Sequence, residues 1–171
     1  MSGGIDRLSS LPAADAEAVF LACCGAPSWA RRMAVGRPYR DDADLLQAAD
    51  RVWRDLDHGD WLQAFAAHPR IGERKPGEDQ ARRWAAQEQA SVLGPNAAPG
   101  SALAELAAAQ RTYEERFGHI FIVCATGKSA EEMLALLRAR LDNDPETELR
   151  AAAEEQRKIT RLRLEKWLAD A

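Results

Sequence analysis

The chain has 171 residues, of which 46% are hydrophobic and 29% are charged, and its formal net charge is -4. This length suits one compact domain with its own core, and the acidic balance argues against binding to nucleic acid or to an anionic membrane surface. The sequence shows neither a membrane-spanning stretch nor a signal-peptide pattern, so we expect a cytoplasmic protein.

Helical periodicity recurs in about eight segments, and strand-forming residues are sparse. The predicted helices cover 13–24, 28–35, 42–57, 60–67, 78–93, 101–117, 129–142 and 145–169. Turn residues separate them: Gly25 and Pro27 lie between the first two, and Asp144 caps the last one before Pro145. The sequence therefore predicts a single all-α domain over residues 1–171, built as a bundle of about eight helices.

A histidine follows the fourth predicted helix, in the stretch "AAHPRIGERK". Pro69 disfavours a helical conformation of His68, so this imidazole should lie on extended or turn backbone. Gly72 then permits a sharp change of direction. The imidazole either packs against the turn or is presented to a ligand, and the decapeptide alone leaves both interpretations open.

Two predicted helices place a charged side chain on their buried face. Glu88 continues the apolar stripe that contains Ala85, and Arg163 follows Gln156 and Ile159 at helical spacing. A buried carboxylate is unfavourable unless it is paired, so Glu88 and Arg163 could form an internal ion pair. The forked donors of the arginine can equally bind a planar anion.

The segment "HIFIVCATG", from His119 to Gly127, departs from the helical pattern. Its β-branched and aromatic residues predict a short extended segment near 119–125. With no other strand predicted, its backbone groups lack ladder partners, although buried polar groups must be satisfied. Contacts from helices or water are one solution, and a ligand rich in amides is the other.

The three cysteines, Cys23, Cys24 and Cys124, form no CxxC motif and are interpreted as free thiols in a reducing cytosol. A nucleophilic Cys124 is an alternative, but no neighbouring charge in the sequence activates it. The histidines and cysteines show no metal-ligand spacing, and phosphate-binding glycine motifs are absent. The sequence therefore predicts a polar pocket without a metal or an organic cofactor.

Five segments, in this order, resemble the 2-oxo-4-hydroxy-4-carboxy-5-ureidoimidazoline (OHCU) decarboxylase family. They are "CGAPSWARRMAVGRPY", "AFAAHPRIGE", "AAQEQAS", "YEERFGHIFIVCATGKSAEEML" and "RLDNDPETELRAAAEEQRKITRLRLEKWL". This family performs the last step from urate to (S)-allantoin. The resemblance implies a cofactor-independent carboxy-lyase with a small ureidoimidazoline substrate, and it favours a homodimer.

The resemblance also implies the site residues. His68 would be the acid/base catalyst, assisted by Glu88 and Arg163, with Pro69 beside the substrate. One helix would line the pocket with Ala85, Ala86, Gln87, Glu88 and Gln89. The extended segment would offer backbone groups to the ring amides from Phe121, Ile122, Val123, Cys124 and Ala125. Arg163 would also bind the substrate.

The sequence departs from the family pattern at three positions. Ala85 stands in place of the usual serine, Gln110 in place of a frequent asparagine, and His119 in place of an aromatic residue. Two alternatives to the decarboxylase remain: a helical binding or regulatory module without catalysis, and an enzyme that acts on another ureide.

Overall fold

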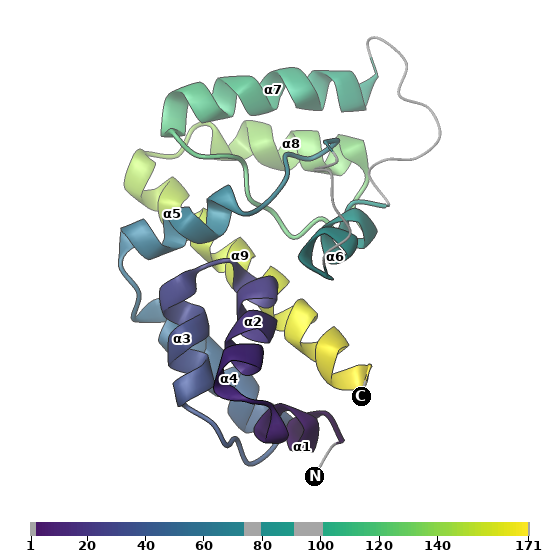
Figure 1. Cartoon of the computed structure of the whole chain (residues 1–171). Helices are drawn as coiled ribbons and strands as arrows, with labels where there is room; N and C mark the ends of the chain where they lie inside the picture. Colours follow the sequence, from purple (N-terminus) through teal and green to yellow (C-terminus); the bar gives the residue numbers. More distant parts are fainter. Residues whose placement is uncertain (1–2, 74–79, 91–100, 171) are drawn as a thin grey trace. The chain divides into compact units, whose positions relative to one another are not determined.

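The computed structural model describes residues 3–73, 80–90 and 101–170, and within these ranges the chain forms nine α-helices and no strand (Figure 1). The helices are α1 (Gly3–Ser10), α2 (Ala13–Cys24), α3 (Pro27–Val35), α4 (Asp42–Arg54), α5 (His58–Ala66), α6 (Gln80–Glu88), α7 (Ala102–Phe117), α8 (Ala130–Arg140) and α9 (Pro145–Ala169). The predicted all-α fold is confirmed. No helix in the described ranges is both long enough and apolar enough to span a membrane.

Helix α1 is the one described helix that the periodicity does not predict. Its sequence begins with two glycines, which are poor helix formers. Tertiary contacts explain why it forms: a Cβ atom on Gly4 would lie 2.6 Å from the Leu168 backbone oxygen, so only glycine permits this approach. The Arg7 guanidinium also stacks over the Trp167 ring, 3.8 Å from its centroid.

The chain divides into two compact units, the first formed by residues 1–64 and 156–171 and the second by residues 65–155. Helix α9 contributes residues to both. In the first unit, α2 and α3 pack through a T-shaped contact between Phe20 and Trp29, with ring centroids 5.7 Å apart. The buried Trp29 indole donates a hydrogen bond to the Ala49 carbonyl oxygen of α4 at 3.1 Å.

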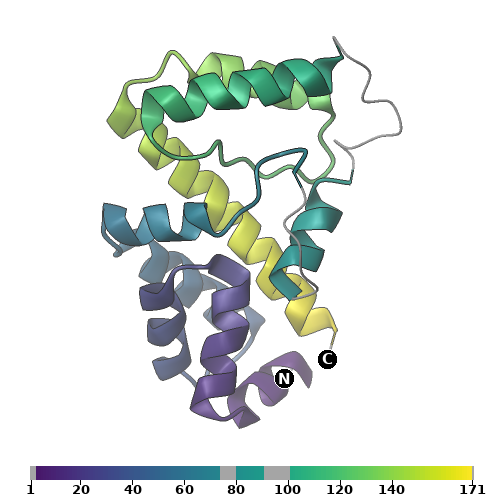
Figure 2. The ribbon, with the colours of Figure 1, turned by 45° about the horizontal axis from the view of Figure 1, so that its top comes forward.

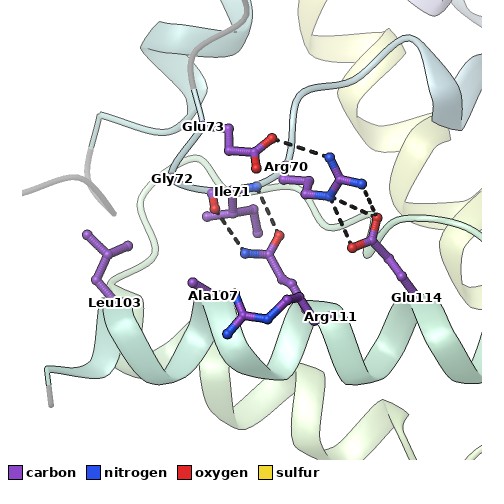
Figure 3. Close-up of a pocket in the computed structure, with 9 residues that line it drawn as sticks. Arg70, Ile71, Gly72, Glu73, Leu103, Ala107, Arg111 and Glu114 are labelled. Atoms are coloured by element: carbon purple, nitrogen blue, oxygen red, sulfur yellow. Dashed lines mark hydrogen bonds and ion pairs between the residues drawn. The ribbon is translucent and has the colours of Figure 1, made fainter. Parts of the chain in front are cut away.

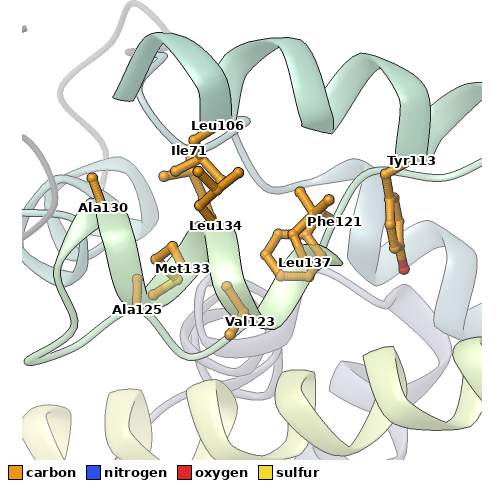
Figure 4. Close-up of a cluster of buried hydrophobic side chains, with 10 residues drawn as sticks. All are labelled: Ile71, Leu106, Tyr113, Phe121, Val123, Ala125, Ala130, Met133, Leu134 and Leu137. Carbon is orange, nitrogen blue, oxygen red and sulfur yellow. The ribbon is translucent and has the colours of Figure 1, made fainter. Parts of the chain in front are cut away.

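The core of the second unit lies between α7, α8 and the chain that connects them, and the two helices lie side by side (Figures 1 and 2). Ten buried side chains form it (Figure 4): Ile71, Leu106, Tyr113, Phe121, Val123, Ala125, Ala130, Met133, Leu134 and Leu137. Helix α8 begins with a capping box in which Ser129 and Glu132 each bond to the other's backbone N–H. This core supports the segments that carry most of the predicted site residues.

Candidate active site

His68 lies in the loop that follows α5, as the proline after it predicts. The His68 N–H donates a hydrogen bond to the Phe65 carbonyl oxygen at 3.1 Å, closing the last turn of the helix. Both His68 and Pro69 are half-buried. The loop then makes a β-turn, in which the Glu73 N–H bonds to the Arg70 carbonyl oxygen at 3.0 Å and Gly72 has a φ of 91°. Glycine suits this position because other residues rarely adopt positive φ.

Two glutamine side chains hold the backbone of this loop. The Gln110 amide accepts a hydrogen bond from the Ile71 N–H at 3.0 Å and donates one to the Ile71 carbonyl oxygen at 2.9 Å (Figure 3). The Gln89 side-chain oxygen accepts from the Gly72 N–H at 3.0 Å. The loop is thus anchored to α7 and to the end of α6, which restricts the backbone that carries His68.

An ion pair at the loop surface adds a third anchor. The Arg70 Nε donates to both carboxylate oxygens of Glu114 on α7, at 2.9 and 3.0 Å. A two-oxygen contact of this kind restricts the orientation of an arginine more than a single contact does.

Helix α6 buries one face that includes Ala85 and Glu88, as the stripe predicts. Glu88 is 7% exposed, which is unusual for a carboxylate, and Gln89 is buried beside it. Ala86 and Gln87 lie on the exposed face of the same helix. Their place in the lining of the substrate pocket therefore stays a prediction. The position of Ala85 inside the unit means that a serine there would direct its hydroxyl to the same buried face.

The segment between α7 and α8 has neither helical nor strand structure, and side chains satisfy part of its backbone. The Arg140 Nη1 donates to the Ile122 carbonyl oxygen at 2.7 Å. The Cys124 N–H donates to the Glu155 carboxylate at 3.4 Å, and its carbonyl oxygen accepts from the Lys128 Nζ at 2.8 Å. The Arg140 and Glu155 contacts come from α8 and α9 and agree with one of the two solutions left open by the sequence, whereas Lys128 precedes α8.

Two alternate residues of the segment, Phe121 and Val123, have no hydrogen-bond partner for their backbone groups among the described residues. Within the described part of the chain, no hydrogen bond reaches the backbone N–H or C=O of Phe121 or Val123. Both residues are buried, at 3% and 7% exposure. Buried backbone groups without a protein partner must be satisfied by water or by a ligand. That an amide-rich ligand binds the backbone of this segment stays a prediction, and these two residues leave room for it.

One ring contact, the Gln89 hydrogen bond and one electrostatic effect connect these elements of the second unit. The Phe65 ring, at the end of α5, lies 5.3 Å from the His119 ring. Gln89 joins α6 to the His68 loop through Gly72. The charge of Glu88 also acts on the Cys124 thiol, which places α6 within electrostatic range of the extended segment. His119 also packs against the Tyr113 and Phe117 rings.

Burial raises the pKa of the Cys124 thiol above its ordinary value. The Lys128 ammonium acts in the opposite direction, whereas the Glu155 and Glu88 carboxylates raise the pKa further. A protonated thiol is a weak nucleophile, so this environment argues against the alternative in which Cys124 attacks a substrate.

Arg163 lies in the first unit and is 4% exposed, in agreement with its predicted inward position. Its Nη1 donates to the Ala22 carbonyl oxygen at 3.4 Å. Burial raises the pKa of the nearby Cys24 thiol to about 12, against the opposing effect of the Arg163 charge. That Arg163 shares a site with His68 and Glu88 stays a prediction, and so does the alternative ion pair with Glu88.

Sequence reasoning assigned no supporting role to two polar residues, Gln110 and Arg140, although helical spacing marks both. Gln110 follows Leu106 and precedes Tyr113 on the buried stripe of α7. Arg140 continues the stripe of Met133 and Leu137 on α8. Each is a polar residue on an apolar face, which is the signal that identified Glu88 and Arg163.

A pocket of about 350 Å³ opens between the His68 loop and α7 (Figure 3). Its lining residues are Arg70, Ile71, Gly72, Glu73, Leu103, Ala107, Gln110, Arg111 and Glu114. None of the predicted site residues is among them, so this pocket is separate from the predicted site and shares with it only the loop backbone. The described ranges also contain no group of three or more histidine, cysteine, aspartate or glutamate side chains arranged to hold a metal ion.

A family model described as OHCU decarboxylase matches residues 9–165, which include residues of both units. The chain is 40% identical over 151 residues to the uric acid degradation bifunctional protein TTL of Arabidopsis thaliana, a match that covers 86% of this chain and 46% of that protein. It is 33% identical over 132 residues to the 2-oxo-4-hydroxy-4-carboxy-5-ureidoimidazoline decarboxylase of Amia calva, covering 76% and 74%. The chain thus spans less than half of the Arabidopsis protein and about three quarters of the Amia enzyme.

Solved structures agree with these relatives. The crystal structure of an OHCU decarboxylase in the presence of (S)-allantoin has a TM-score of 0.76 to this chain at 38% identity, covering 88% of this chain and 97% of that one. An (S)-allantoin synthase shares the fold at a TM-score of 0.69 and 17% identity. The chain therefore belongs to the OHCU decarboxylase family, as its sequence resemblance predicts.

Proposed function

We propose that this chain decarboxylates OHCU to (S)-allantoin, by acid/base catalysis at His68. The family to which the chain belongs is one of decarboxylases of urate degradation. The observation that carries the proposal is the family match over residues 9–165, joined to the likeness to an OHCU decarboxylase crystallised with (S)-allantoin. The second unit supports it with a histidine loop, a buried carboxylate and an open backbone edge.

The chemistry requires little beyond these groups, because the substrate supplies its own electron sink. The bond from ring carbon to carboxylate breaks and carbon dioxide leaves, while the electron pair forms a double bond to the neighbouring ring carbon. The π electrons of the C=N bond move to its nitrogen, which takes up a proton from the solvent, and an enol results. The 4-hydroxyl then loses its proton and becomes a carbonyl, while the neighbouring carbon takes up a proton. The protein must therefore orient the ring, handle the hydroxyl proton and direct a proton to one face.

We assign these tasks to separate groups of the chain. An imidazole suits proton transfer at neutral pH, so His68 handles the proton. The Glu88 carboxylate orients the imidazole or holds the ring nitrogens. The backbone groups of Phe121 and Val123 bind the ring amides, and the Arg163 guanidinium binds the anionic carboxylate or the ureido carbonyl.

The enantiomeric excess of the product tests the function. OHCU also decays spontaneously to racemic allantoin, so only an excess of one enantiomer counts as catalysis. We expect freshly made OHCU to give (S)-allantoin in the presence of the protein, measured by circular dichroism or chiral chromatography. Racemic product at the spontaneous rate would favour the non-catalytic binding module. Turnover of a different ureide, with no effect on OHCU, would favour the third interpretation.

Exhaustive chelation is expected to leave the rate unchanged, because the substrate rather than a metal accepts the electron pair. The measurement compares the initial rate before and after dialysis against EDTA, with a sample re-supplied with zinc or manganese as the control. A rate that falls on dialysis and returns with the metal would contradict cofactor-independent decarboxylation.

Two further features belong to this proposal. A cytoplasmic location is supported by three cysteines that are all free, as expected in a reducing compartment. A homodimer is supported by the family resemblance, and sedimentation equilibrium of the purified chain would test it.

A further inference from the structure

We propose that Arg140 is a positioning residue, which aligns the backbone of residues 121–123 so that the polar groups of Phe121 and Val123 face the substrate. The inference rests on the proposed function, because it names the support of that site. Arg140 itself need not touch the substrate: its contacts are to the segment and to a buried carboxylate.

The Arg140 guanidinium links its own helix, α8, to the segment before α8 and to α9. Its Nη1 donates to the Ile122 carbonyl oxygen at 2.7 Å, and its Nε donates to the Glu148 carboxylate of α9 at 2.8 Å. Its central carbon lies 4.6 Å from the centroid of the Phe121 ring, so the cation also stacks on the segment. The Arg140 side chain is 13% exposed and that of Glu148 is fully buried. In such surroundings a charged pair is energetically favourable only if its remaining hydrogen bonds are also made.

The second half of the network meets that condition. The Tyr113 hydroxyl of α7 donates a short hydrogen bond to Glu148, and the Asn143 amide donates to the other Glu148 oxygen at 3.0 Å. The Tyr113 ring packs edge-on against the Phe121 ring, with centroids 5.3 Å apart. Burial and the adjacent Glu148 raise the pKa of Tyr113, so the hydroxyl stays a donor. Both oxygens of the carboxylate are thus occupied, and Arg140 is held in one orientation.

Two alternations along the segment explain why the contact at Ile122 controls its neighbours. The side chains of Phe121, Val123 and Ala125 enter the core of the second unit, as every second side chain of an extended chain would (Figure 4). Among residues 121–124, the described backbone hydrogen bonds fall instead on Ile122 and Cys124, and the Ala125 carbonyl oxygen accepts one from the Lys128 N–H in the turn that follows. Successive peptide groups of an extended chain point to opposite sides. Holding the Ile122 carbonyl toward Arg140 therefore directs the groups of Phe121 and Val123 to the opposite edge.

A purely structural ion pair would not need this arrangement. A link between α8 and α9 requires only the contact of Arg140 with Glu148, and an apolar pair can often replace such a link. The additional donor at the Ile122 carbonyl uses the planar fork of arginine, which a lysine ammonium cannot reproduce. Loss of this geometry should loosen the segment and affect substrate binding more than proton transfer.

The test compares Arg140→Lys with Arg138→Lys in steady-state kinetics on OHCU. Arg138 lies on the same helix, but its side chain is 60% exposed and its Nη2 lies 3.8 Å from Glu105. We expect Arg140→Lys to raise KM about tenfold and to weaken (S)-allantoin binding in calorimetry by a similar factor, the scale of one charged hydrogen bond. We expect kcat of Arg140→Lys to stay within about threefold of wild type, because the lost interaction stabilises the bound substrate and the transition state equally. Arg138→Lys should match wild type in both parameters.

A folded Arg140→Lys variant with a lower Tm but unchanged KM and (S)-allantoin affinity would overturn the positioning role. If that variant does not fold, Tyr113→Phe decides, because it keeps the ring and removes only the hydroxyl bond to Glu148. The expected change is a KM increase of about twofold to threefold, and an unchanged KM would contradict the proposal. Wild-type protein without enantiomeric excess would instead refute the proposed function, which separates the two failures.

Discussion

The His68→Asn variant is expected to lose at least about 100-fold in kcat, the scale of one positioned proton-transfer group. Asparagine keeps a polar side chain after the last turn of α5 but cannot exchange a proton near neutral pH. The loop backbone should persist, since Gln110 and Gln89 hold Ile71 and Gly72 independently of the imidazole. The loss should therefore appear in kcat, with KM changed much less.

The matched control is His58→Asn, ten positions earlier in the chain. His58 is exposed at the start of α5, where it stacks on Trp61 with ring centroids 5.4 Å apart. Initial rates with freshly made OHCU, corrected for spontaneous decay, would be measured for both variants, with circular dichroism as the check on folding. Near-normal turnover of His68→Asn would contradict the catalytic role of His68 and indicate that the imidazole only packs against the turn.

Replacing Arg163 with lysine is expected to lower kcat/KM at least about tenfold, which corresponds to ~1.4 kcal/mol. Lysine keeps the positive charge but lacks the two parallel donors that bind a carboxylate or ureido group. If Arg163 served only to neutralise Glu88 within the core, lysine would preserve much of that attraction. The loss would then appear as a lower Tm, while the folded fraction would turn over normally.

Arg161→Lys is the control for this experiment, because Arg161 lies on the same helix and is 41% exposed. Its partners are the Asp50 and Glu165 carboxylates, each at 3.5 Å. Thermal unfolding and kcat/KM would be measured for both variants. An Arg163→Lys variant that unfolds several degrees earlier but keeps its catalytic efficiency would contradict the substrate-binding role of Arg163.

Local patterns predicted most of the helices, because a 3.6-residue apolar repeat and the residues at helix ends are written within each segment. The predicted helix at 145–169 matches α9 at both ends, and Asp144 caps it as expected. Part of the predicted helix at 78–93 lies outside the described residues. Helix α1 was missed because Gly4 is accommodated by the Leu168 backbone, about 160 positions away in the chain, and no local signal reports that contact.

The sequence by itself determined the helical fold, the inward positions of Glu88 and Arg163, the turn that carries His68 and the family to which the chain belongs. Periodicity suffices for these features because each depends on residues within a few turns of the chain.

Only the tertiary structure decided which backbone groups of the segment before α8 are paired. Arg140 and Glu155, which pair with Ile122 and Cys124, lie 18 and 31 positions beyond them in the chain. Because these two side chains bond to Ile122 and Cys124, the backbone groups of Phe121 have no protein partner within the described ranges. The physical reason is that a hydrogen bond depends on the distance and direction between two groups in space, and spacing along the chain specifies these only within one regular element.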